Sequence, residues 1–182
     1  SEMCIRDSLN TSASILVSED QSLKLIDRLF TCLTYSNTAV KCASAWCLRT
    51  IASSLPAMTS ALLDSTMDRL SLIRQPSDAL VGYGYACAAL LASVSECPLG
   101  VPNILPKLAF NIGEELLRTA SQSNNLQLAE QKTSIGWILL GAFMTNGTSL
   151  VRKHLSRLKK LWNLTFPTSL EQLESEKKRG DV

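Results

Sequence analysis

An apolar segment rich in small residues occurs three times in this chain, and each copy ends at a proline or a glycine. The copies cover 44–56, 86–98 and 135–147, so they recur roughly every forty to fifty residues. Each copy is followed by a segment whose apolar residues have helical spacing. A helix pair of this length cannot bury its own apolar face and has to stack on a neighbouring pair. The recurrence therefore predicts an all-α chain of stacked helix pairs.

A period of about forty residues is typical of an α-α superhelix of the HEAT or armadillo type. We expect about three complete pairs at about 36–75, 77–121 and 126–166, after a leading helix and before a short helix at about 168–177. The array would occupy 9–182. Residues 1–8 match no helical pattern, and we expect them to be a non-native or disordered leader.

The composition favours helices, and the net charge is small. Hydrophobic residues make up 46% of the chain and aromatic residues 5%, which suits helix stacking better than a β-sandwich. The formal net charge of +2 favours neither nucleic acid nor a membrane as a partner. An uncharged stretch at 133–151 has the length of a membrane span, but its continuous apolar part ends at Met144. We therefore expect a buried helix there.

The first helix of each expected pair is apolar over most of its circumference, whereas the second has one apolar stripe. The three predicted stripes are Leu63, Met67, Leu70 and Ile73; Leu105, Leu108, Ile112 and Leu116; and Val151, Leu155, Leu158 and Trp162. Trp46 and Trp137 occupy equivalent places in the first and third repeats, and we expect both side chains to lie in the core.

Glycines in the first helices predict a close approach of neighbouring helix axes. Gly82, Gly84, Gly136 and Gly141 all lie in these helices. Gly82-x-Gly84 also resembles the opening of a dinucleotide-binding loop, but Cys87 takes the place of the third glycine and no strand precedes it. Close packing is the better explanation for all four glycines.

The six cysteines and the single histidine, His154, do not form a metal site. No two cysteines form a CxxC pair, so no zinc set can be assembled. We expect most of the cysteines to be free thiols that pack as small hydrophobes, in a reducing cytosolic compartment. We expect no metal and no cofactor.

His154 is also the only histidine available as a general base. It stands in RKHLSRLKK without an obvious carboxylate to orient it, and the chain has no GxSxG elbow. We therefore expect that the protein is not an enzyme. A hydrolase that uses His154 is the competing enzyme hypothesis.

A basic ridge is the one surface feature with chemical content. Lys153, Arg157 and Lys160 would share one side of a helix, at i, i+4 and i+7. They could bind an acidic protein segment, anionic lipid headgroups or phosphate. An ordinary solvated helix face is the commoner explanation for such a cluster. Nucleic acid is disfavoured because few basic residues cluster and no exposed aromatic residues are interleaved.

Five long strings carry a family resemblance: VKCASAWCLRTIASSLP (40–56), CPLGVPN (97–103), EELLRTASQ (114–122), GWILLGAFMTNG (136–147) and VRKHLSRLKKLWNLTFPTSLEQLESEKKRGD (151–181). In register over about 36–181, the chain resembles the HEAT-repeat-containing protein 5 family. Members of this family are very large cytosolic HEAT-repeat proteins, so the resemblance implies that the chain is a fragment of such a protein.

The resemblance implies a scaffold that associates with the clathrin adaptor complex and its accessory proteins, at the trans-Golgi network and at the periphery of endosomes and vesicles. It also implies roles in endocytosis, endosome-to-Golgi retrograde transport and protein localisation, with peripheral membrane association at most, through partners. It carries no catalytic or partner-binding residue over to positions in this chain. The alternative is a karyopherin-like or phosphatase-scaffold HEAT protein, which would differ in its protein partners.

Overall fold

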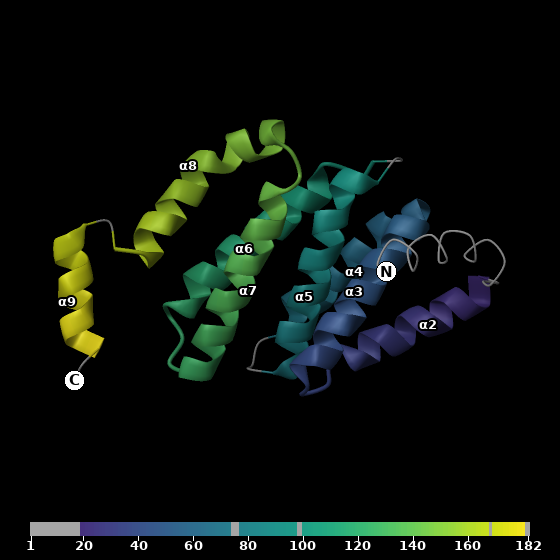
Figure 1. Cartoon of the computed structure of the whole chain (residues 1–182), viewed down its shortest axis with the longest axis horizontal. Coiled ribbons are helices and arrows are strands. Elements are labelled where there is room, and N and C mark those ends of the chain that lie inside the picture. The colour runs from purple at the N-terminus through teal and green to yellow at the C-terminus, as the bar shows by residue number, and fades with distance from the viewer. Residues whose placement is uncertain (1–18, 74–76, 98–99, 168, 181–182) are drawn as a thin grey trace, which may run out of the picture. The chain divides into compact units, whose positions relative to one another are not determined.

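The computed structural model describes residues 19–73, 77–97, 100–167 and 169–180 (Figure 1). All regular secondary structure in these ranges is helical, which confirms the all-α prediction. The expected leader at 1–8 lies outside the described residues. The chain separates into two compact units, of which the first ends at Asn146 and the second begins at Gly147.

The first unit contains α2 (Glu19–Cys32), α3 (Thr38–Ser54), α4 (Thr59–Leu72), α5 (Asp78–Ser93), α6 (Ile104–Ala120) and α7 (Leu126–Met144). A 3₁₀ turn at Pro56–Met58 precedes α4, and another at Val94–Glu96 follows α5. The second unit contains α8 (Thr148–Thr165) and α9 (Leu170–Gly180). No helix in the part of the chain that the structure describes is both long enough and apolar enough to cross a membrane.

Polar side chains cap the starts of α3 and α5 in the first unit. The Asn37 side chain accepts hydrogen bonds from the backbone N–H groups of Ala39 and Val40, at 2.8 and 3.4 Å, and so caps α3. The Ser77 hydroxyl accepts from the Leu80 N–H at 3.2 Å and caps α5. Each cap satisfies backbone donors that the helix itself leaves without a partner. These two helix boundaries are therefore determined locally.

The helices α3, α5 and α7 lie side by side in the first unit (Figure 1). The middle helix, α5, packs against α3 on one side and against α7 on the other, and α4 lies beside α6. Packing of α4 on α5 and of α6 on α7 is more extensive than packing of α3 on α4 or of α5 on α6. The second helix of each of these pairs therefore packs more extensively on the first helix of the next pair than on the first helix of its own pair.

Glycines allow this close packing at two places on α5. A Cβ atom at Gly82 would overlap the backbone carbonyl of Leu33, and a Cβ atom at Gly84 would lie 2.5 Å from Cγ2 of Ile135. The predicted packing role is confirmed for both residues, and the dinucleotide-loop reading is not needed. The prediction is wrong for Gly141, because a Cβ atom there would meet nothing within 4 Å.

The contact between α6 and α7 is built from small and aromatic residues. Phe110 and Phe143 are at most 1% exposed, and their ring centroids are 5.0 Å apart. Beside them, a Cβ atom at Gly136 would lie 3.0 Å from the carbonyl oxygen of Gly113. The predicted packing role of Gly136 is therefore confirmed. Aromatic pairs at this separation add to the free energy that area burial alone contributes.

The predicted apolar stripe of α4 is confirmed for Leu63, Met67 and Leu70, which are buried, but Ile73 is half-buried and follows the end of the helix. The predicted stripe of α6 is buried only at Leu105. On α6, Leu108 is 40% exposed, and the buried face is displaced toward Leu117. Gly113 lies on this buried face, where a Cβ atom would be 3.2 Å from the carbonyl oxygen of Gly136 on α7.

The expectation that Trp46 lies in the core is wrong. Its side chain is 58% exposed, whereas Trp137 is half-buried. The guanidinium carbon of Arg49 lies 5.4 Å from the centre of the Trp46 ring, which is a cation–π distance. The buried face of α3 includes Ala45 and Leu48 instead. Equivalent positions in the sequence repeat therefore do not have equivalent neighbours.

The second unit begins at a glycine with an unusual backbone conformation. Gly147 has φ +98° and ψ 146° and directly precedes α8. An L-residue with a Cβ atom rarely adopts this conformation, whereas glycine does so without steric conflict. A Cβ atom here would meet nothing within 4 Å. The requirement for glycine at this position therefore comes from the backbone torsion and not from lack of space.

Candidate functional site: the basic helix α8

Five basic side chains and no acidic one give α8 the largest net charge among the helices that the structure describes. The predicted ridge residues Lys153, Arg157 and Lys160 all lie on this helix. Lys153 and Lys160 are exposed, while Arg157 is half-buried. Nη1 of Arg157 lies 3.5 Å from Nδ1 of His154, at the limit of a hydrogen bond. The exposed charge of the predicted ridge is therefore carried by its two lysines.

The apolar stripe predicted to bury α8 in the core is largely exposed, so that prediction is wrong. Leu155 and Trp162 are each 54% exposed, and Val151 and Leu158 are half-buried. Phe166 follows at the end of the helix, 38% exposed, with its ring centroid 4.3 Å from that of Trp162. Helical spacing shows that these residues share a face, but it does not show whether another helix covers that face.

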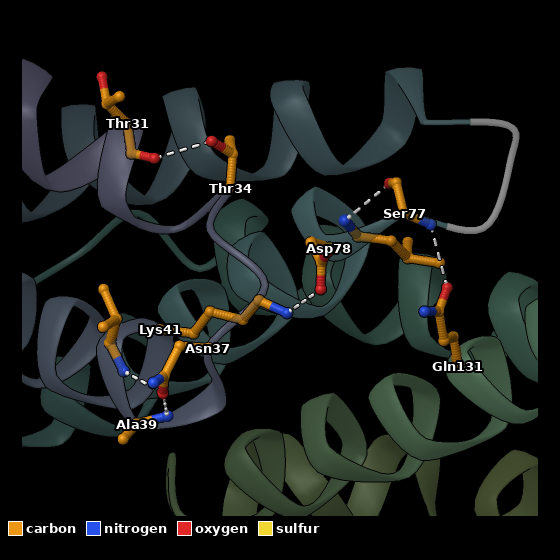
Figure 2. Close-up of polar contacts among 10 residues, drawn as sticks. Thr31, Thr34, Asn37, Ala39, Lys41, Ser77, Asp78 and Gln131 are labelled. Carbon is orange, nitrogen blue, oxygen red and sulfur yellow. Dashed lines mark hydrogen bonds and ion pairs between the residues drawn. The ribbon is translucent and has the colours of Figure 1, made fainter.

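A polar cluster at the start of α5 is a feature that sequence reasoning missed. Nζ of Lys41 lies 2.5 Å from a carboxylate oxygen of Asp78, and Lys41 is only 3% exposed (Figure 2). The backbone N–H of Ser77 donates to the side-chain oxygen of Gln131 at 3.2 Å. These contacts join α3, α5 and α7 at one place.

The Lys41–Asp78 ion pair joins α3 to α5 within the first unit. A buried ammonium group has to be paired, and Asp78 supplies the opposite charge. Asp78 also lies in the first turn of α5, where the helix dipole favours a negative charge. Nothing in the local sequence marks the pair, because the two residues are 37 positions apart.

The described residues provide no metal centre. Within 19–73, 77–97, 100–167 and 169–180, no three His, Cys, Asp or Glu residues are grouped so that they could hold a metal ion. The cysteines differ in exposure, contrary to the expectation that most are packed as hydrophobes. Cys87 is buried, whereas Cys42 and Cys47 are exposed.

Cys87 is fully buried, and we expect its thiol to be unreactive in the folded protein. Removal from water raises the pKa of its thiol to about 12, and the thiolate is the reactive form. We expect Ellman's reagent at pH 8 to label Cys42 and Cys47 of the folded protein quickly, and Cys87 only after unfolding. Peptide mapping by mass spectrometry after timed labelling would check this. Labelling of Cys87 as fast as that of Cys42 would contradict the burial of α5.

No known family model matches the chain, and no solved structure matches it. The structure itself defines the class of the protein as all-helical, with three helices stacked side by side in its first unit and an exposed basic helix in its second.

Proposed function

We propose that the chain is part of a non-enzymatic scaffold with a HEAT-type superhelical architecture. The observation that supports this proposal is the side-by-side stacking of α3, α5 and α7. Each of these helices is followed closely by a proline, a 3₁₀ turn or a glycine. The helices that come after α5 and α7 are the more amphipathic members of their pairs. A stack of this kind extends by adding further pairs and presents long surfaces to protein partners.

The partner class comes from the family resemblance. On that basis we propose that the scaffold acts in clathrin-adaptor-linked trafficking, in endocytosis and in endosome-to-Golgi transport, at the trans-Golgi network and endosomes. Lys153, Arg157 and Lys160 are the candidate contact surface on α8. A karyopherin-like or phosphatase-scaffold protein is the alternative, since the stacking of helices would be the same.

Affinity capture from cytosol tests the proposal. We expect the immobilised chain to retain clathrin adaptor subunits, as measured by quantitative mass spectrometry. Charge reversal of the two exposed ridge lysines, Lys153→Glu with Lys160→Glu, should lower this recovery about fivefold at low salt, because exposed charges act mainly through steering and are screened by salt.

A matched control variant makes the same change of charge at lysines outside α8. Lys107 on α6 and Lys177 on α9 are exposed, and Lys107→Glu with Lys177→Glu should leave the recovery of adaptor subunits unchanged. Recovery of importin cargo or phosphatase subunits without adaptor would overturn the trafficking proposal. An equal loss with both double variants would reject the ridge as the contact.

A further inference from the structure

Four apolar residues of α8, of which two are exposed and two half-buried, have the spacing of a coiled-coil seam. Val151, Leu155, Leu158 and Trp162 follow one another at intervals of four, three and four residues. This is the spacing of the d and a positions of a heptad. Leu155 and Trp162 are both 54% exposed. The seam pattern is therefore present on a face that remains open to solvent.

Two basic residues border this seam on one side. When Leu155 is placed at a heptad position a, Arg152 and Lys159 both fall at position e. Both side chains are exposed. Charges at position e influence which helix binds as the partner, because they lie beside the charged positions of the facing helix. The α8 helix itself contains no acidic residue.

We propose that this face of α8, which consists of Val151, Arg152, Leu155, Leu158, Lys159 and Trp162, binds an acidic amphipathic helix of a partner protein. The inference rests on the proposed scaffold function and names the partner's chemistry. Leucine-like side chains of the partner pack around Leu155 and Trp162, and its glutamates or aspartates meet Arg152 and Lys159. Trp and Arg are the residue types that most often dominate such interfaces.

A protein helix fits the surface better than an anionic membrane does. The cations of α8 would be attracted to anionic lipid, but α9 in the same unit carries three acidic and three basic residues and adds no net attraction. A helix that lies in the membrane interface also immerses a wide apolar face. On α8, Val151 and Leu158 are half-buried, so the exposed part is a narrow seam.

The test uses a defined probe, a fluorescent three-heptad peptide with leucine at positions a and d and glutamate at e and g. Binding to the whole chain is measured by anisotropy. We expect Arg152→Glu with Lys159→Glu to weaken binding at least about tenfold, because each charge then faces a like charge. Leu155→Ala with Trp162→Ala should weaken it by at least as much, through loss of the apolar contact.

The matched control is Lys107→Glu with Lys177→Glu, which makes the same charge change at exposed lysines outside α8. It should leave the affinity within about twofold. A second peptide with lysine at e and g should bind the wild-type chain more weakly and the Arg152→Glu, Lys159→Glu variant more tightly. Such a gain cannot result from misfolding.

Three outcomes would overturn the inference. These are equal binding of the two peptides by the wild-type chain, equal losses in the two charge-reversal variants, and binding to phosphatidylserine vesicles but not to the glutamate peptide. Self-association of the chain that is abolished by Leu155→Ala with Trp162→Ala would assign the face to a second copy instead. Failure here with continued capture of adaptor subunits would leave the scaffold function standing.

Discussion

Replacing Gly82 with alanine is expected to lower the free energy of unfolding by about 3 kcal/mol or more, which is at the upper end for overpacked sites. The new Cβ atom would overlap the backbone carbonyl of Leu33. Backbone cannot rotate away as a flexible side chain can, so α5 would have to move from the end of α2. Thermal unfolding followed by circular dichroism should show a decrease in Tm of about 10 °C for a chain of this size.

The control for this variant is Gly141→Ala, which is the same chemical change in another helix. Gly141 lies within α7 and has nothing near its Cβ position. Alanine is the better helix former, so this variant should be more stable than the wild type by about 0.5–1 kcal/mol. Two variants with the same sign would contradict the close approach at Gly82.

Removing the carboxylate in Asp78→Ala is expected to destabilise the first unit by about 2–3 kcal/mol. The loss of free energy comes mainly from leaving the Lys41 ammonium without its partner, because the Lys41 side chain is only 3% exposed. Asp78 itself is 48% exposed, so we place the loss below the range for fully buried pairs. Urea unfolding of wild type and variant under the same conditions would measure it.

A second substitution separates the charge from the packing. In Lys41→Met with Asp78→Ala, no buried charge remains, and the double variant should recover most of the stability lost by Asp78→Ala alone. Glu115→Ala provides the surface comparison, because the Glu115–Arg118 pair is exposed on both sides. It should change the free energy of unfolding by less than about 0.5 kcal/mol. A loss equal to that of Asp78→Ala would contradict the burial argument.

Periodicity predicted the helices of this chain and part of its core. The stripe of Leu63, Met67 and Leu70 could be predicted because α4 has one apolar side and that side is buried. Gly82 and Gly84 could also be assigned to packing, since their segment is helical and offers no strand before it. These features depend on local spacing alone.

The remaining features depend on which helix faces which, and local spacing does not contain that information. Trp46 has the same place in its repeat as Trp137, but different neighbours make it exposed. The Lys41–Asp78 pair joins residues far apart in the chain. On α8, the spacing of Leu155 and Trp162 predicts a buried face, because a buried seam and an exposed seam have the same sequence pattern.

Gly84 and Gly147 differ in whether a second substitution elsewhere in the chain could offset the replacement of the glycine. At Gly84 the obstacle is the Ile135 side chain, so a smaller residue at 135 could restore the fit of an alanine, and the two positions can vary together. At Gly147 the obstacle is the backbone torsion itself. No neighbour causes it, so no neighbouring substitution can relieve it. Gly84 is thus constrained by its partner, whereas Gly147 is constrained in any sequence that keeps this chain path.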